Sequence, residues 1–344
     1  MIITTTTYAR VGLIGNPSDG YFGKTISFSI RNFSAQITLY ESPELEIKLH
    51  KNDRLTFRSI QHLVEDIRFS GYYGGIRLIK AAIKKFYEYC QEEHLTLEEK
   101  NFTILYDSNI PLRVGLAGSS AIITCVMKAL MQFYGVEIEK PILVNLILSV
   151  ETKELGISAG LQDRVIQVYE NMVYMDFNRQ YMEEYGYGYY EYLEPEVLPN
   201  FYVAYSDELS EGTEVFHNNI RQRYENGDRQ VHEAMAEWAE ITTRFREALL
   251  AGDLPTMNAL INRNFNLRAS IYQISKRNWE LINCARNVGA SSKFCGSGGA
   301  IVGIYADEAM YRRLEIELKK LHACLIKPII FAEKEDSPEE GEEV

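Results

Sequence analysis

The sequence predicts an α+β protein with two domains or one large divided domain, and three observations support this prediction. Runs of alternating apolar and polar residues, typical of strands, mix with amphipathic helical runs, and no regular βαβ repeat connects them. The chain has 344 residues, a length that suggests two domains or one large domain with a divided core. Hydrophobic residues make up 46% of the sequence and charged residues 24%, the profile of an ordinary globular protein.

The first half of the chain alternates strand and helix patterns. Strands are expected at 26–39, 46–49, 55–57, 102–106 and 173–177. Apolar residues at helical spacing predict helices at 76–89, 120–134, 141–154 and 161–169. The stretch 181–192 is rich in tyrosine and glutamate, and we interpret it as an irregular hairpin or connection at the domain junction.

The second half has a different pattern. A strand at 201–205 precedes charged helical patterns over 215–250 and 256–288, then a glycine-rich turn and strand at 294–305 and a helix at 310–321. The change near 176–200 predicts one domain at 1–178 and another at 179–333. Residues 334–344 combine few apolar groups with dense negative charge, so we expect a disordered tail.

The charge balance limits the partners of the protein. Lysine and arginine number 36 and acidic residues 48, so the formal net charge is −12. Such a surface repels phosphate backbones, and we expect no nucleic-acid partner. It repels an anionic substrate too, so a site for an acidic ligand must supply positive charge locally.

The cysteines and the apolar runs indicate the compartment. The five cysteines are odd in number and form no CxxC pair, which favours a reducing environment. The N-terminus, MIITTTTYAR, lacks the features of a signal peptide, and no apolar run reaches the roughly 18 residues needed to cross a bilayer. We therefore expect a cytoplasmic protein without a membrane partner.

Three glycine-rich segments are the main functional signals: RVGLIGNPSDGYFGKT at 10–25, PLRVGLAGSSA at 111–121 and SSKFCGSGGAIVGI at 291–304. In the second, Gly115 and Gly118 let the backbone approach a ligand, and Ser119 and Ser120 begin a helix whose free N–H groups attract anions. It is not a Walker A loop, because no Gly-Lys-Ser/Thr follows. Each segment alone is equally typical of an ordinary turn, with solvated charges or serine capping.

Two carboxylates between these segments are further candidates. Glu151 falls late in the helix after Pro141, and Asp163 follows a turn bounded by glycines. Either acid alone is more often a surface charge, and Asp163 is also well placed as an acid at the start of a helix.

In this order, the three segments resemble the signature of the GHMP kinases, the superfamily of galactokinase, homoserine kinase, mevalonate kinase and phosphomevalonate kinase. The segments GYYGGIRL, KELGISAGLQDRVIQVY and MDF extend the resemblance to the plant-type glucuronokinase subgroup. The similarity spans residues 8–303 and excludes the acidic tail. It implies an N-terminal lobe like ribosomal protein S5, a C-terminal α+β sandwich, and ATP bound between them.

The resemblance also implies roles for single residues. The phosphates of ATP would be held by Gly115, Leu116, Ala117, Gly118, Ser119, Ser120, Gly296, Gly298 and Gly299. Ser120 and Glu151 would bind Mg²⁺. Asp163 would deprotonate or orient the acceptor hydroxyl, and Arg10 would lower the pKa of that hydroxyl.

For the acceptor, Asp19 matches the sugar-binding aspartate of sugar-kinase members. A carboxylate on the substrate calls for arginine or lysine. The candidates are Lys24 and Arg164, with Arg113 and Arg268 as further possibilities, and the sequence does not rank them.

The pattern departs from many members of the superfamily at two places. Tyr8-Ala9 replaces Pro-Gly, and Asn16-Pro17 replaces Glu-His, which argues against a direct transfer of galactose or mevalonate contacts. The glucuronokinase pattern shares both departures. The resemblance thus implies an ATP-dependent kinase that phosphorylates the anomeric hydroxyl of D-glucuronate. The alternatives are a kinase for a galactose, fucose or heptose type of sugar, or a non-catalytic ligand sensor; the oligomeric state stays open.

Overall fold

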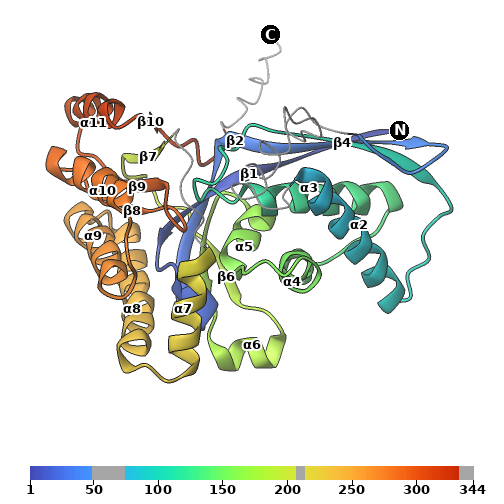
Figure 1. Cartoon of the computed structure of the whole chain (residues 1–344), viewed down its shortest axis with the longest axis horizontal. Coiled ribbons are helices and arrows are strands. Elements are labelled where there is room, and N and C mark those ends of the chain that lie inside the picture. The colour runs from blue at the N-terminus through green and yellow to red at the C-terminus, as the bar shows by residue number, and fades with distance from the viewer. Residues whose placement is uncertain (49–73, 207–213, 333–344) are drawn as a thin grey trace, which may run out of the picture.

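The computed structural model describes residues 1–48, 74–206 and 214–332 (Figure 1). Within these ranges, the strands form a six-stranded sheet in the first half and a four-stranded sheet in the second. This agrees with the predicted α+β class. The strand expected at 55–57 and the tail expected at 334–344 lie outside the described residues.

The first sheet is built on a long antiparallel pair. The strand β1 (Ile2–Ile14) pairs with β2 (Lys24–Ser42), and β2 pairs in turn with β4 (Asn101–Ser108) and β5 (Met172–Asp176). The register of β1 and β2 shifts between Tyr8 and Ala9 and again between Gly12 and Ile14. Such irregularities twist a strand and redirect its side chains, and here they flank Arg10.

Helices cover one face of this sheet. The helices α3 (Gly118–Tyr134) and α5 (Leu161–Tyr169) pack on β1 and β2, with α2 (Gly75–Glu92) and α4 (Lys140–Ser149) packed beside them (Figure 1). The helix α3 is apolar nearly all round, as expected for a buried helix. A π-helical turn, η2 (Val150–Glu154), follows α4 within the predicted helix 141–154, and π-helical turns are frequent at functional sites.

The tyrosine-rich stretch differs from the prediction. It contains a helix, α6 (Arg179–Tyr185), and a strand, β6 (Tyr189–Tyr192), which extends the first sheet beyond β5. The Asn178 side chain caps α6 at its start, and Gly186 ends it in the left-handed conformation. The change of sheet therefore falls after β6, and the short strand β3 (Glu46–Ile47) pairs with β4 at the opposite edge.

The second sheet has the order β10-β7-β9-β8. Its strands are β7 (Phe201–Ser206), β8 (Lys293–Phe294), β9 (Ala300–Ile304) and the unpredicted β10 (Ala323–Ile326). The helices of this half are α7 (Glu214–Glu225), α8 (Arg229–Ala251), α9 (Leu254–Ile271), α10 (Lys276–Val288) and α11 (Glu308–Lys320). The two long helical patterns are each divided, because Asp228 and Ser275 cap new helices.

The main hydrophobic core joins both halves. It contains Val11 and Phe28 from the first sheet together with Trp238 of α8 and Met257 of α9. A second cluster, which includes Phe265 and Phe294, lies wholly in the second half. None of the helices described is both long and apolar enough to cross a bilayer.

Candidate active site

An ion pair between Arg10 and Asp163 lies at the centre of the candidate site. Arg10 comes from β1, and Asp163 comes from the first turn of α5, which packs against that strand. Arg10 Nη2 is 2.7 Å from Asp163 Oδ1, and the two side chains are 6% and 23% exposed. The carboxylate therefore keeps some access to a ligand while the guanidinium is buried behind it.

Arg10 contacts all three glycine-rich segments. It belongs to the first, its Nη1 donates to the carbonyl of Gly115 (3.1 Å) in the second, and Nη1 also donates to the carbonyl of Cys295 (2.6 Å) in the third. The backbone N–H of Arg10 donates to Leu116 O (3.1 Å). Segments far apart in the sequence are thus joined at one guanidinium.

The second segment has a backbone suited to an anion. Arg113, Gly115 and Ala117 occupy alternate positions and have positive φ values of 59°, 76° and 62°. Alternation of left-handed and ordinary conformations turns successive N–H groups into one concavity, which binds anions. Ala117 is also the N-cap of α3, and no side chain caps that helix. Its first N–H groups are thus left for a ligand.

Two side chains hold the start of α3. The hydroxyl of Ser120 donates to the carbonyl of Ala117 (3.2 Å), and Nε2 of Gln167 donates to the same carbonyl (2.8 Å). Gln167 was not among the predicted site residues. The signal that could have found it is its place one helical turn after Asp163 and Arg164, on the same face of α5 as these two predicted residues. Leu116 and Ser120 are buried, so Leu116 offers a ligand only its backbone.

Glu151 and Arg164 form a buried, very short ion pair, and each side chain is 4% exposed. Arg164 also donates to Gly160 O (2.8 Å) and lies 3.4 Å from Asp163 Oδ2. Burial, and then repulsion from Arg10, lower the pKa of Arg164 to about 9, so the side chain remains charged at neutral pH. Arg164 therefore joins the two predicted functional carboxylates, Glu151 and Asp163, and its described contacts leave little of it for a substrate.

Asp19 lies beside the same group, on the 3₁₀ turn η1 (Ser18–Tyr21). Its Oδ2 accepts a hydrogen bond from the backbone N–H of Gln162 (3.4 Å). A Cβ on Gly160 would lie 2.3 Å from Asp19 Oδ2, so glycine is required there for the approach. Burial, and then repulsion from Asp163, raise the pKa of Asp19 to about 6. Asp19 and Asp163 thus lie close enough to influence each other.

The third segment packs directly on the second. A Cβ on Gly296 would lie 2.5 Å from Gly115 O, and one on Gly115 would lie 2.9 Å from Gly298 O. Neither position has room for a side chain. Arg268 of α9 supports this loop from the other side, donating to Gly296 O (3.1 Å) and Ser297 O (3.4 Å). Gly298 and Gly299 have φ values of 139° and 79°, which favour glycine.

A buried lysine, missed by sequence reasoning, fastens the third segment to the first. Lys293 is 1% exposed, and its Nζ donates to Gly12 O (2.6 Å) and Phe294 O (2.6 Å). Burial is the main cause that lowers the pKa of Lys293 well below its usual range. Lys293 lies within the third glycine-rich segment, but nothing in the sequence pattern distinguishes this lysine from an exposed one.

The structure does not place Lys24 with the residues around the Arg10–Asp163 pair. Its Nζ lies 3.3 Å from Asp176 Oδ2 and 3.5 Å from the Thr243 hydroxyl, on the side where β2 meets β5 and α8. Arg113 is exposed on the second segment. The other predicted residues, from Arg10 and Asp19 to the three glycine-rich segments, lie together.

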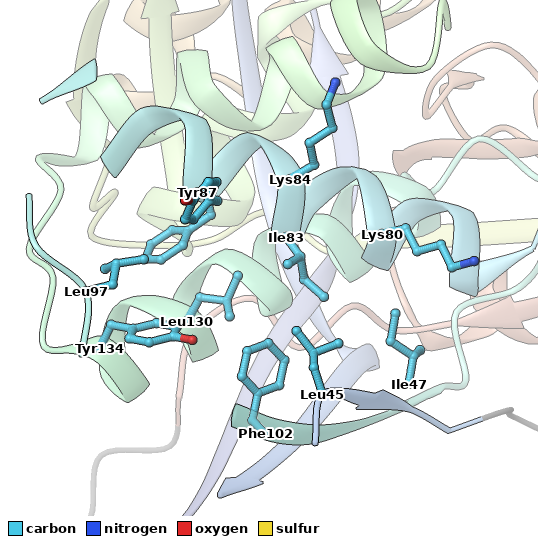
Figure 2. A pocket seen from close by; sticks show the side chains of 11 residues that line it. Leu45, Ile47, Lys80, Ile83, Lys84, Tyr87, Leu97, Phe102, Leu130 and Tyr134 are labelled. Atoms are coloured by element: carbon cyan, nitrogen blue, oxygen red, sulfur yellow. The ribbon is translucent and has the colours of Figure 1, made fainter. Parts of the chain in front are cut away.

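A separate apolar pocket of about 470 Å³ lies among α2, α3, β3 and β4. Figure 2 shows Ile83 and Leu130 facing Leu45, Ile47 and Phe102 across it. Its lining includes none of the predicted site residues. We therefore describe it as a feature of the first half of the chain that is distinct from the Arg10–Asp163 group.

Two of the predicted residues carry oxygen donors that suit a magnesium ion bound together with a nucleotide. Mg²⁺ prefers oxygen ligands and in such sites takes only one or two from the protein, the rest coming from phosphates and water. Ser120 and Glu151 offer a hydroxyl and a carboxylate. The described residues contain no cluster of three or more histidine, cysteine or acidic side chains that could hold a metal without a nucleotide.

Comparison with known proteins identifies the family. Residues 77–171 match the GHMP kinases N terminal domain, and residues 245–320 match the GHMP kinases C terminal domain. Probable glucuronokinase 2 of Arabidopsis thaliana is 43% identical over 94% of this chain and 89% of its own length. Glucuronokinase 1 of the same plant is 41% identical over 91% and 88%.

Solved structures agree on the fold. The galactokinase of Lactococcus lactis, in a crystal structure with galactose, superposes with a TM-score of 0.76 at 16% identity, covering 96% of this chain and 93% of the other. Identity over nearly the whole length of the two plant relatives, with both family domains in order, leaves one assignment: the chain belongs to the GHMP kinases and is a relative of the glucuronokinases.

Proposed function

We propose that this kinase transfers the γ-phosphoryl group of ATP to the anomeric hydroxyl of D-glucuronate, giving glucuronate 1-phosphate and ADP. As a GHMP kinase, the chain is a phosphotransferase with an alcohol group as acceptor. The activity named for the plant relatives supports the choice of sugar. The observation that carries the proposal is the Arg10–Asp163 pair at the junction of the glycine-rich segments.

Asp163 is proposed to act on the acceptor hydroxyl. Its carboxylate is partly exposed and would accept the proton, or a hydrogen bond, from the hydroxyl as the new O–P bond forms. Arg10 fixes the orientation of this carboxylate. It also places positive charge beside the developing negative charge at the acceptor oxygen.

The phosphates of ATP would lie on the second segment. Phosphoryl transfer depends on positioning and charge stabilisation more than on covalent chemistry. The N–H concavity at 113–117 and the uncapped start of α3 supply both without a lysine. The third segment, pressed against Gly115, would close the other side of the phosphate site.

Ser120 and Glu151 are proposed to hold Mg²⁺. When bound with ATP, the ion neutralises negative charge on the phosphate oxygens. Glu151 is oriented by Arg164, which also contacts Asp163. Arg164 would thus set the spacing between the metal-side carboxylate and the carboxylate at the acceptor.

Asp19 is proposed to hold a sugar hydroxyl, since it lies beside Asp163 on the turn of the first segment. Lys24 is less favoured as a substrate contact than the sequence suggested, because it pairs with Asp176. A cytoplasmic location is part of the same proposal and is in keeping with five free cysteines.

A panel of sugars tests the proposal. ADP release would be measured with ATP, Mg²⁺ and D-glucuronate, D-galacturonate, D-glucose, D-galactose, L-fucose or a heptose phosphate. We expect kcat/KM for glucuronate to exceed that for the neutral sugars by at least about 100-fold, because a site built to pair with a charged group rejects analogues that lack it. Higher activity with galactose, fucose or a heptose phosphate would reject glucuronate. Nucleotide binding without transfer to any sugar would indicate a ligand sensor.

A further inference from the structure

Arg221, on α7, lies beside the turn that carries Asp19. Its guanidinium carbon is 5.9 Å from the centre of the Tyr21 ring, and its Nη2 lies 3.8 Å from the position that a Cβ on Gly20 would occupy. The Tyr21 ring packs against Tyr224, one turn further along α7, with centroids 4.8 Å apart. Tyr21 thus connects α7 to the turn η1, which carries Asp19.

Electrostatic interactions connect Tyr21 with residues of the candidate site. Burial raises the pKa of Tyr21, Arg221 acts in the opposite direction, and Asp19 adds to the increase. Asp19 in turn is affected by Asp163. The turn that carries Asp19 and Tyr21 thus contacts α5 through Gln162 and also lies beside the exposed Arg221.

Three other arginines near Asp19 are already engaged. Arg10 and Arg164 pair with carboxylates and donate to backbone carbonyls. Both terminal nitrogens of Arg268 donate to carbonyls of the third segment, and its guanidinium lies over the rings of Tyr272 and Phe294. These contacts hold the loops in place, so a substrate that used one of these groups would have to displace part of the site itself.

Arg221 differs from them. Its side chain is exposed, and within the described ranges it makes no ion pair or hydrogen bond to a carboxylate or carbonyl. An arginine fork matches a carboxylate in two parallel hydrogen bonds, which a lysine does not reproduce. Its guanidinium lies beside the turn that carries Asp19.

We propose that Arg221 binds the carboxylate of the sugar acid and so selects it over neutral sugars. This inference rests on the proposed function and adds the residue that recognises the uronate. With the anomeric hydroxyl at Asp163 and a ring hydroxyl at Asp19, the carboxyl group on C5, across the ring oxygen from the anomeric carbon, would reach Arg221. The net charge of −12 makes such a local cation necessary for an anionic substrate.

The experiment compares D-glucuronate with D-glucuronamide, a neutral analogue of nearly the same shape. KM and kcat for both would be measured for the wild type and for Arg221→Gln and Arg221→Lys. The control is Arg229→Gln, which removes the same charge from a residue whose side chain is 90% exposed and which pairs with Glu233 along its own helix. The ratio of the two KM values is insensitive to a general loss of folded protein.

We expect Arg221→Gln to raise KM for glucuronate by about 10- to 100-fold, the effect of losing a charge-assisted hydrogen bond, with a smaller change in kcat. KM for glucuronamide should change by less than about threefold, so the variant should lose most of the preference for glucuronate over glucuronamide. Arg221→Lys should retain only part of this preference, and Arg229→Gln should behave as the wild type.

The failures are distinguishable. An unchanged ratio of the two KM values in Arg221→Gln, with glucuronate still the preferred substrate of the wild type, overturns the inference alone. A wild type that does not phosphorylate glucuronate overturns the proposed function, and the inference with it.

Discussion

Replacement of Asp163 by asparagine tests the role of the central ion pair. The change keeps the size of the side chain and an oxygen that Arg10 can contact, but it removes the charge that accepts a proton. The Arg10–Asp163 distance is 2.7 Å, and a bond to a charged group of this kind stabilises the fold by up to about 3 kcal/mol. Because asparagine still accepts from Arg10, we expect a loss of folding stability of at most about 2 kcal/mol.

The effect on turnover should be much larger. General-base assistance contributes about 10² to 10⁴ in rate, which corresponds to about 3 to 5 kcal/mol in the activation barrier. The phosphate site of the second segment does not involve the Asp163 carboxylate in any described contact. Nucleotide affinity should therefore stay within about a factor of three, less than about 0.7 kcal/mol.

Three measurements check this expectation: kcat by ADP release, the Kd of a non-hydrolysable ATP analogue by titration, and the free energy of unfolding by denaturant. The control is Glu191→Gln, which makes the same change from carboxylate to amide in the Arg246–Glu191 pair (2.5 Å) on β6 and α8. That variant should lose a similar or smaller amount of stability and retain kcat. Turnover of Asp163→Asn within tenfold of the wild type would remove Asp163 from the proposed role.

Three further predictions follow from the same contacts. Glu151→Gln leaves Arg164 buried without its carboxylate partner, which should lower the free energy of unfolding by about 3 to 5 kcal/mol. The Mg²⁺ concentration that gives the half-maximal rate should rise. An unchanged Mg²⁺ titration would reject Glu151 as a metal ligand. Asp19 has a folded pKa of about 6, above its ordinary value of 3.8, so the native state binds more protons in this window and its contribution to stability falls as pH rises from about 4 to 6. Asp19→Asn should therefore gain stability relative to the wild type across that range, measured by thermal unfolding, while losing sugar affinity; a difference independent of pH would contradict the assigned pKa. Gly296→Ala should reduce kcat and destabilise the protein by about 1 to 3 kcal/mol, since the new methyl group meets Gly115 O at 2.5 Å, whereas Gly135→Ala, which has open space, should lose only the smaller cost of its left-handed backbone.

The sequence predicted the fold class because that information is local or periodic. The strand at 26–39 and the helix at 120–134 were recognised from their apolar spacing, and the structure extends each by a few residues. The break at Gly227 was missed because both flanking segments have good helical patterns. The strand at 323–326 was missed because its pairing with β7 is a property of the assembled sheet.

The candidate site shows the same division. The resemblance of the three glycine-rich segments to the GHMP kinase signature implied that they form one site, and most of the named residues do lie together. The bonds that join them are not visible in the sequence, because they link positions such as Arg10 and Cys295, which are 285 residues apart. The pairing of Arg164 with Glu151, and the burial of Lys293, likewise depend on which elements pack together and not on local spacing.

The apolar core that passes through both halves bears on how the molecule unfolds. Val11 and Phe28 share one cluster with Trp238 and Met257, so exposing either half to water strips apolar contacts from the other. A chain that reads as two domains along its length is thereby expected to melt cooperatively. Scanning calorimetry should record a single heat-absorption peak, with calorimetric and van't Hoff enthalpies that agree.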